Sequence, residues 1–390
     1  MFSLLLIIYF AFISLGLPDG LLGAGWPAMY PQLEVPVSYA GIISAIIMAG
    51  TIVSSLMSTR LVRWVGAGRV TTYSVATTAL ALFGFAYSPS FAVMCLWAIP
   101  YGLGAGGVDS AINNYAAIHY SSRHMNWLHG MWGVGAATGP YIMGFCIQHS
   151  DWQLGYSTVG IVQIVLTVML FISLPQWKKP GEATVPQAAE ALRLVDVVRV
   201  PGAKQIVLTF FCYCALEQTA MLWASTYFSA ARGMRDDTAA FLGSLFLVGI
   251  TIGRFGSGFL AGRRTDRQMI HLGMTLIGIG IVVLLAAPEA WVAVAGFLLI
   301  GLGCAPVYPS IIHSTPDLFG AEHSQSVVGV EMAGAYVGSL TMPPLFGFLG
   351  QTGSTFFLPL YLAGILVVMI LAYQSLLRVQ GRQAPERPSR

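Results

Sequence analysis

The sequence predicts an all-α membrane protein with twelve transmembrane helices in two six-helix halves, and three observations indicate this fold class. Of the 390 residues, 56% are hydrophobic and 9% are charged, and mean hydropathy is +0.73, whereas about a quarter of the residues in a soluble domain are charged. Twelve segments are long enough to cross a bilayer, and basic residues lie between alternate segments. A soluble fold has no interior large enough for so much apolar surface.

The twelve segments follow one another along most of the chain. A bilayer core of about 30 Å requires roughly twenty helical residues. The first apolar segment lacks a basic leader and a small-residue cleavage site, so we interpret it as a membrane helix rather than a signal peptide. The expected spans are residues 3–30, 39–59, 71–88, 90–117, 127–149, 155–175, 204–229, 238–260, 268–287, 290–314, 325–349 and 355–378.

The longest polar interruption falls between the sixth and seventh spans. It divides the chain into an N-terminal six-helix bundle at 1–175, a cytoplasmic linker at 176–203, a C-terminal six-helix bundle at 204–379 and a cytoplasmic tail at 380–390. We expect the transporter to act as a monomer.

The basic residues predict the orientation of the spans. With the N-terminus placed in the cytoplasm, every Lys and Arg except Arg232, Arg235 and Arg254 lies on the cytoplasmic side. This asymmetry follows the positive-inside rule, and we expect both termini to be cytoplasmic, in a plasma membrane or bacterial inner membrane. Arg254 lies inside the eighth span near its cytoplasmic end, where we expect its side chain to snorkel to the interface.

Several functional classes are excluded. The chain contains no P-loop, no His-Glu-x-x-His pair and no Gly-x-Ser-x-Gly turn, so we expect neither an enzyme nor an ATP-driven pump. The five cysteines lie in apolar segments without ligand-like spacing to histidine, which favours buried packing over a metal site. We expect no cofactor and, because no basic run is present, no binding of nucleic acid.

Two intramembrane acids are candidates for ion coupling. Asp19 follows Pro18 between Gly16 and Gly20, residues that weaken the helix and leave backbone groups free to face a cavity. A carboxylate at mid-membrane costs on the order of 3 kcal/mol on insertion scales, so its presence favours a water-filled pathway. The alternative is a structural aspartate that caps the broken helix.

Asp109 lies in the fourth span, one helical turn before Asn113, so the two side chains share a face. Asn114 follows directly. We interpret Asp109 as a coupling-ion or gate residue, and the alternative is a salt bridge with Arg60 or Arg63. Carboxylate and amide groups serve protons and sodium alike, so both H+ and Na+ stay open as the coupling ion.

The acids also indicate an internal repeat. Asp19, Asp109 and Glu217 lie in the first, fourth and seventh spans, which are the first helices of successive three-span units. Nested inverted repeats of this kind place the substrate site near the midplane, between the two halves.

Polar and aromatic residues in the later spans are suited to a neutral polyol. Glu217 and Gln218 can bind paired hydroxyl groups, and the rings of Trp223 and Tyr227 can stack on a pyranose, although an interfacial aromatic belt explains the two rings nearly as well. His129 opens the fifth span and is of a type that titrates near neutral pH, although an interfacial histidine bonded to a loop explains it equally well. Glu331 is a lone acid in the eleventh span. The candidate substrate residues are therefore Asn113, Asn114, His129, Glu217, Gln218, Trp223, Tyr227 and Glu331.

Over nearly its whole length the chain resembles the major facilitator superfamily, and within it the fucose:proton symporter family and its sodium-dependent glucose transporter relatives. The likeness rests on segments 16–20, 126–130 and 305–309, on Asp109 with Asn113 and Asn114, on Gly133, Gly135, Gly139 and Pro140, and on Glu217 with Trp223. The resemblance implies sugar uptake by alternating access, with Asp19 and Asp109 carrying the coupling ion. The expected function is import of a neutral sugar, of hexose size, by cation-coupled symport.

Two alternatives stay open. A drug or metabolite exporter on the same fold is favoured by segment 135–140, which is similar to an antiporter motif of the fifth span. It is disfavoured by Pro100, where drug:proton antiporters place an arginine. A separate departure, from the superfamily as a whole, is the first intracellular loop at 60–69, which lacks the usual acidic residue and so does not indicate the usual gate contacts. A nutrient receptor that binds sugar without moving it is disfavoured because no signalling domain follows the last span.

Overall fold

A computed structural model describes residues 2–120, 122–177, 197, 199–260, 263–350 and 355–383. The predicted linker at 176–203 and the predicted tail at 380–390 lie largely outside these residues. The described chain is helical throughout, with α-helices joined by short turns and single turns of tighter or wider helix. A long helix is the only continuous structure that satisfies its own backbone hydrogen bonds in lipid without a closed barrel.

The helices form two halves in chain order. The N-terminal half contains α1 (Phe2–Gly16), α2 (Leu21–Gln32), η1 (Val37–Tyr39), α3 (Ala40–Val65), α4 (Ala67–Ala86), α5 (Phe91–His119), α6 (Ser122–His149), α7 (Trp152–Ser173) and η2 (Leu174–Gln176). The C-terminal half contains α9 (Ala203–Thr226), the π-helical η3 (Tyr227–Ala231), α10 (Asp236–Leu260), α11 (Asp266–Ala286), α12 (Ala290–Phe319), α13 (Ala321–Gly350), η4 (Thr355–Phe357) and α14 (Leu358–Gln383).

The predicted fold class is confirmed. Within the described residues, nine helical segments are long and apolar enough to cross a membrane, the first of them running through α1 and α2 together. The helices α4, α6 and α13 complete the set of twelve. Two of these three pack against the opposite half of the molecule, α6 on α10 and α13 on α3. Their glycines and polar residues lower their hydropathy, and such residues are common where a membrane helix packs against protein.

The first span is broken between α1 and α2, at residues 17–20. Pro18 has no backbone N–H to donate. The N–H of the next residue, Asp19, donates to the Gly16 carbonyl three residues earlier, not four as in an α-helix. Gly16 also lets α1 approach α6, because a methyl group there would lie 2.1 Å from the Trp132 carbonyl oxygen. The helix therefore breaks where the Pro and Gly residues predict, and the structure places this break against α6.

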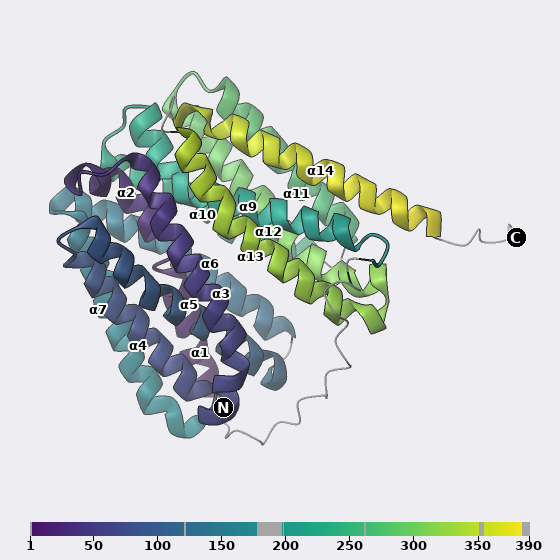
Figure 1. Ribbon diagram of the computed structural model, residues 1–390, viewed down its shortest axis with the longest axis horizontal. Coiled ribbons are helices and arrows are strands. Elements are labelled where there is room, and N and C mark those ends of the chain that lie inside the picture. The colour runs from purple at the N-terminus through teal and green to yellow at the C-terminus, as the bar shows by residue number, and fades with distance from the viewer. Residues whose placement is uncertain are drawn as a thin grey trace, which may run out of the picture.

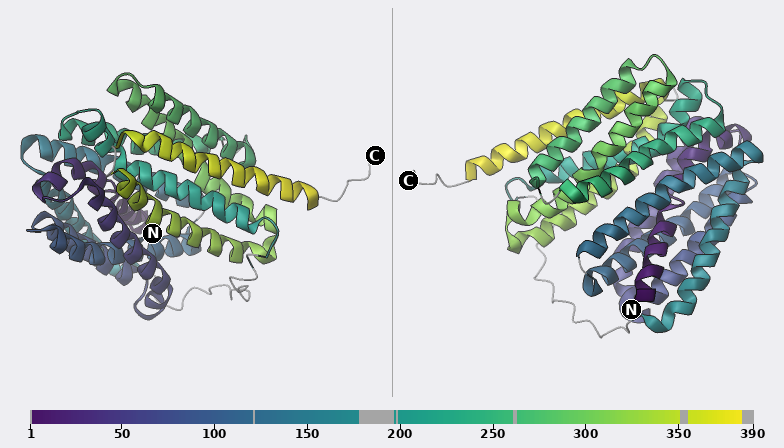
Figure 2. Two further views of the ribbon diagram at one scale, coloured as in Figure 1. Left: turned by 45° about the horizontal axis from the view of Figure 1, so that its top comes forward. Right: turned by 180° about the vertical axis from the view of Figure 1, so that it is seen from behind.

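The two halves lie side by side as two bundles, closest at the end where α2 ends (Figures 1 and 2). From there the ribbons diverge toward the end where α1 begins. Contacts of α6 with α10, of α3 with α13, and of α2 with both α9 and α10 join the halves. A methyl group at Gly23 of α2 would lie 2.6 Å from the Met221 carbonyl oxygen of α9, so small residues permit this contact.

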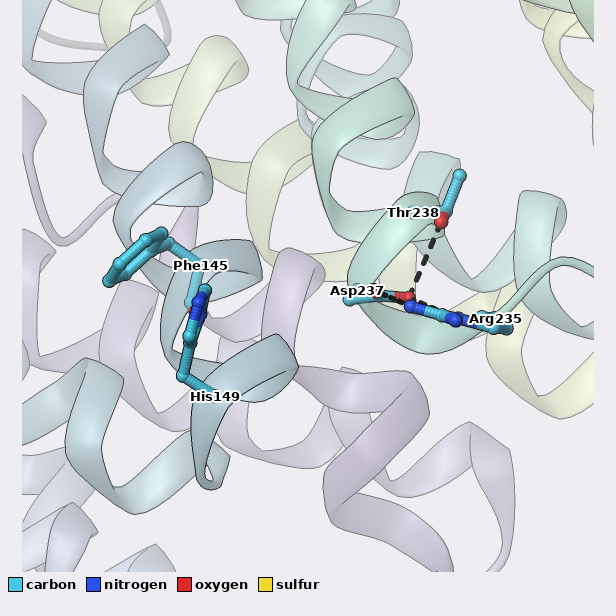
Figure 3. A network of polar contacts seen from close by, with 5 residues as sticks. All are labelled: Phe145, His149, Arg235, Asp237 and Thr238. Atoms are coloured by element: carbon cyan, nitrogen blue, oxygen red, sulfur yellow. Dashed lines mark hydrogen bonds and ion pairs between the residues drawn. The ribbon is translucent and has the colours of Figure 1, made fainter.

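The end of α6 packs against the start of α10 (Figure 3). A methyl group at Gly144 would lie 3.1 Å from the carbonyl oxygen of Asp237 and 3.6 Å from Cβ of Ala240. At the same point Arg235 pairs with the Asp237 carboxylate, which also accepts a hydrogen bond of 3.3 Å from Thr238. The polar start of α10 thus lies against the end of α6.

Candidate functional site

Asp19 lies where the helix break meets α6. Its carboxylate accepts a hydrogen bond of 2.8 Å from the indole N–H of Trp132. Within the described residues no Lys, Arg or His lies within ion-pair distance of this carboxylate. Asp19 is therefore a half-buried acid whose charge is met by a neutral donor.

A narrow cavity adjoins Asp19 inside the N-terminal bundle, between α1, α4, α5 and α7. Its polar lining includes Ser14, Thr78, Tyr101 and Gln163. Gln163 of α7 holds α1 just before the break, since its side-chain amide donates to the Ser14 carbonyl at 2.6 Å. The volume open to the centre of a water molecule is about 10 Å³, which is near the lower limit for holding one water. The cavity is therefore far too small for a sugar.

Trp132 connects Asp19 to the other half of the molecule. While its N–H donates to Asp19, its ring face contacts the guanidinium of Arg254 on α10, 4.5 Å from the ring centroid. A cation over the face of an indole is attracted by the negative face of the ring, and tryptophan is the strongest aromatic partner for this contact. The contact bridges α6 of the N-terminal half and α10 of the C-terminal half.

Arg254 in turn pairs with Glu217 on α9, with 3.7 Å between Nη2 and Oε1. Glu217 is buried, and Tyr213 lies near it one turn earlier on α9. The four residues Asp19, Trp132, Arg254 and Glu217 form a continuous chain of contacts across the two halves, which we name the inter-half charge chain. With both acids ionised, two acids and one base leave one negative charge, and Asp19 is the acid that is not paired with the base.

Asp109 lies on α5 beside the inter-half charge chain. Its carboxylate accepts a hydrogen bond of 2.7 Å from Asn113, which lies one turn later, as predicted. Asp109 interacts electrostatically with Asp19 and also with Tyr308 and Tyr336 of the C-terminal half. Asp109 therefore faces the other half. The side chain of Asn114 lies outside the described residues.

His129 lies on the same face of α6 as Trp132, one turn earlier in the chain. Its ring contacts Phe12 of α1 edge-on, with 5.8 Å between centroids. It also interacts electrostatically with Arg254, and its side chain is solvent-accessible. The structure thus brings His129 beside the inter-half charge chain.

The predicted cluster on α9 is not brought together. Glu217 faces Arg254, and Gln218 is half-buried on an adjacent face. The ring of Trp223 is buried and its N–H donates to the Pro343 carbonyl at 2.9 Å. Six residues along a helix is well short of two turns, so Trp223 points away from the side that carries Glu217.

Tyr227 and Glu331 also have other partners. Tyr227 is buried in η3, where its hydroxyl accepts a hydrogen bond of 2.8 Å from Arg232. Glu331 is fully buried between α12 and α13, and it accepts a hydrogen bond of 3.0 Å from Thr315. Both side chains serve contacts inside the C-terminal half.

Two residues of the inter-half charge chain are additions to the predicted site. The position of Arg254 in the eighth span suggested snorkelling, but its side chain points between the halves and contacts Trp132 and Glu217. Trp132 was recognisable only by its position, one turn after His129. A lone arginine inside a span was the stronger signal, because such a charge normally has a partner inside the protein.

Comparison with known proteins identifies the family. The model of the Major Facilitator Superfamily matches residues 8–235 and 206–390. Bypass of stop codon protein 6 of Saccharomyces cerevisiae is similar to this chain, with 21% identity over 90% of this chain and 77% of the yeast protein. An uncharacterized transporter of Sinorhizobium fredii is 21% identical over 92% of this chain and 95% of its own. Membrane protein MosC of Rhizobium meliloti is 22% identical over 85% of this chain and 81% of MosC.

Solved structures share the fold. The crystal structure of the peptide transporter POT has a TM-score of 0.78 at 14% identity, covering 97% of this chain and 95% of that one. A bacterial homologue of the human lysosomal transporter Spinster has a TM-score of 0.73 at 11% identity, covering 100% and 98%. At these identities the likeness concerns the arrangement of the helices.

Proposed function

This chain belongs to the Major Facilitator Superfamily, and from that premise we propose that it imports a neutral sugar, of hexose size, by cation-coupled symport. The resemblance to the fucose:proton symporter family supports the substrate class. The observation that carries the coupling is the inter-half charge chain, in which Glu217 is matched by Arg254, while among the described residues Asp19 is met by the indole N–H and by no base.

The unmatched carboxylate of Asp19 is the group that a cation would neutralise. A half-buried carboxylate without a counter-charge is costly in a membrane interior, and binding a proton or a sodium ion removes that cost. The cavity beside Asp19 has room for about one water molecule, which suits a proton delivered through water or a single small cation held by protein groups. Asp109, with Asn113 as its donor, is the second acid in this part of the site.

The sugar would bind between the halves, where Glu217, Gln218 and His129 supply polar groups. A carboxylate and a guanidinium side by side can accept from and donate to neighbouring hydroxyls, and the pair of Glu217 and Arg254 adds no net charge, which suits a neutral ligand. The helices α1 and α6 belong to one half and α9 and α10 to the other. Rocking of the halves would therefore expose a substrate in this position to each side of the membrane in turn. Trp223, Tyr227 and Glu331 are left out of this proposal because their polar atoms have other partners.

We place the protein in the plasma membrane or a bacterial inner membrane, as a monomer with both termini in the cytoplasm. The uneven distribution of Lys and Arg supports this orientation.

Uptake into proteoliposomes tests the proposal. A panel of labelled hexoses is supplied under an inward proton gradient, first without sodium and then with it. A potential of 100 mV supplies about 2.3 kcal/mol per charge, enough for roughly fifty-fold accumulation with one cation. Accumulation without sodium that an uncoupler collapses indicates proton symport, whereas accumulation only with sodium indicates sodium symport. Uptake of no hexose in either condition would overturn the sugar assignment.

The variant Asp19→Asn tests the coupling residue in the same vesicles. Asparagine has the size of aspartate, and its amide oxygen can still accept the hydrogen bond from Trp132. It carries no negative charge for a cation to neutralise. We expect no uphill accumulation, while exchange of labelled against unlabelled sugar continues. Full uphill uptake by Asp19→Asn would remove Asp19 from the coupling role.

The alternative, a drug or metabolite exporter, rests on the similarity of segment 135–140 to an antiporter motif. Two glycines of this segment also have a packing reason: a methyl group at Gly135 or Gly139 would lie 2.0 Å from the carbonyl oxygens of Ile13 and Leu17 respectively. Close packing of α6 on α1 thus accounts for these glycines without an export function. Greater retention of toxic compounds in cells that lack the protein would favour the exporter.

A further inference from the structure

A groove of about 530 Å³ lies between α11 and α14, on the side of the C-terminal half away from the site. Figure 1 shows α14 at the outer edge of this half. Most of the groove is apolar, with Gly278, Ile279 and Val282 on α11 and Leu366 and Ile370 on α14. One end is polar, where His271, Thr275 and Gln374 line it.

The groove occupies a helix seam that is filled in the other half. Counting spans, α11 and α14 are the third and sixth of their half, as α4 and α7 are of theirs. The helices α4 and α7 pack closely, and a methyl group at Gly160 would lie 3.0 Å from the Phe83 ring. Across the groove, a methyl group at Gly278 would meet only Leu366, at 3.6 Å. The described side chains of this half therefore leave the seam between α11 and α14 open.

The groove opens toward the lipid. Val282 on α11 and Val367 on α14 are 63% and 54% exposed. Large apolar side chains at these exposures, on two membrane helices, face hydrocarbon. The expected occupant of the apolar part is an acyl chain.

The polar end is built from both helices. Nδ1 of His271 lies 2.7 Å from the Arg267 carbonyl oxygen, which can only accept, so the proton is on Nδ1. Nε2 then accepts from the amide of Gln374 across the groove, at 3.2 Å. This assignment leaves Gln374 one further amide hydrogen to donate to a ligand.

Positive charge flanks this end. Arg267 lies one turn before His271, and Arg378 lies one turn after Gln374, so each arginine extends the groove-lining face of its helix. Both arginines are exposed, and within the described residues no carboxylate lies within 4 Å of either guanidinium. Two such cations at the membrane boundary attract an anionic head group.

We propose that the groove between α11 and α14 is a binding site for an anionic phospholipid. An acyl chain lies along Gly278, Ile279 and Leu366. The phosphate lies between Arg267 and Arg378, and Gln374 donates a hydrogen bond to one of its oxygens. This assignment is independent of which sugar or ion the protein carries.

Lipid retention of the detergent-purified full chain tests the site by native mass spectrometry. The protein receives equal amounts of phosphatidylglycerol and phosphatidylcholine. The unmodified protein should retain phosphatidylglycerol preferentially, and the double variant Arg267→Gln with Arg378→Gln should lose about fivefold in that preference for each arginine removed. The matched control is Arg263→Gln with Arg264→Gln, which removes the same charge from the adjacent loop and should retain the preference. Equal loss in both double variants, or no preference in the unmodified protein, would overturn the proposal.

A second variant tests the apolar part. Phenylalanine at Gly278 points into open space beside Leu366, so Gly278→Phe should fill the groove and displace the lipid with the arginines unchanged. Phosphatidylglycerol should raise the unfolding temperature of the unmodified protein but not that of Gly278→Phe. Inorganic phosphate at millimolar concentration should raise neither. Equal stabilisation by phosphate and by phosphatidylglycerol would identify an anion site without an acyl-chain groove, and stabilisation of Gly278→Phe by the lipid would place the lipid elsewhere.

Discussion

Trp132 uses two different parts of its side chain. The indole N–H donates to Asp19 in its own half, and the ring face meets Arg254 of the other half. A change in the charge of Asp19 can therefore act on Arg254 of the C-terminal half through Trp132 alone. If a cation binds Asp19 as proposed, the carboxylate would accept less strongly from the indole, and the ring would then be free to shift relative to Arg254.

The variant Trp132→Phe separates the two contacts, because phenylalanine keeps a ring face and has no N–H. The anionic carboxylate loses a donor worth about 1.5 kcal/mol or more, so the cation-bound form is favoured. We expect the half-saturating cation concentration for uptake to fall about tenfold. The measurement is initial uptake against cation concentration, and the exposed Trp64→Phe on α3 is the control. An unchanged cation dependence would mean that the hydrogen bond has no part in coupling.

The pair of Glu217 and Arg254 is a second test at the residue scale. Removal of one partner leaves a buried charge alone, which costs about 3 kcal/mol or more, whereas removal of both is far less costly. We expect Glu217→Gln and Arg254→Gln each to lower the unfolding temperature, and the double variant to recover part of the loss. Thermal unfolding of the four proteins in one detergent gives the coupling energy. Additive losses would show that the two side chains do not interact.

At the scale of elements, the helix break and its contact with α6 position Asp19. Gly16 permits this contact because no side chain separates it from the Trp132 backbone. The broken helix therefore serves two purposes: Pro18 leaves the Ser14 carbonyl available to accept from Gln163, and the break brings Asp19 within reach of the indole.

The variant Gly16→Ala should separate α1 from α6. Its methyl group would lie 2.1 Å from a backbone oxygen, so one helix must move, at a cost of about 1–3 kcal/mol. We expect a lower unfolding temperature and weaker cation-driven uptake. The control is Gly364→Ala on α14, where nothing lies within 4 Å and the alanine should be neutral or slightly stabilising. Equal behaviour of the two variants would show that the close contact has no role.

At the scale of the whole molecule, the two halves must separate at one end and approach at the other if transport proceeds by alternating access. In this structure the end of α6 and the start of α10 are in contact. A covalent link at this end would prevent the separation.

A disulfide between Gly144→Cys and Ala240→Cys tests this motion. The Cβ positions lie 3.6 Å apart, within the usual range of disulfides. The five native cysteines are first replaced, because Cys146 lies close by. We expect oxidation to abolish uptake and reduction to restore it, with both single-cysteine proteins active throughout. Full uptake by the oxidised, cross-linked protein would exclude opening at this end.

The sequence by itself determined the fold class, the twelve spans and the break at Pro18, because apolar length and backbone chemistry are local properties. It also indicated Asp19, Asp109 and Glu217 as intramembrane acids, since a charge in an apolar segment is visible without its partners. Only the tertiary structure decided which of these side chains meet. Arg254 contacts Trp132 and Glu217, whereas Trp223 and Tyr227 turn into the C-terminal half. The rotation of each helix about its axis, and the contacts between the halves, arise from packing among residues far apart in the chain, and periodicity within one span carries no information about them.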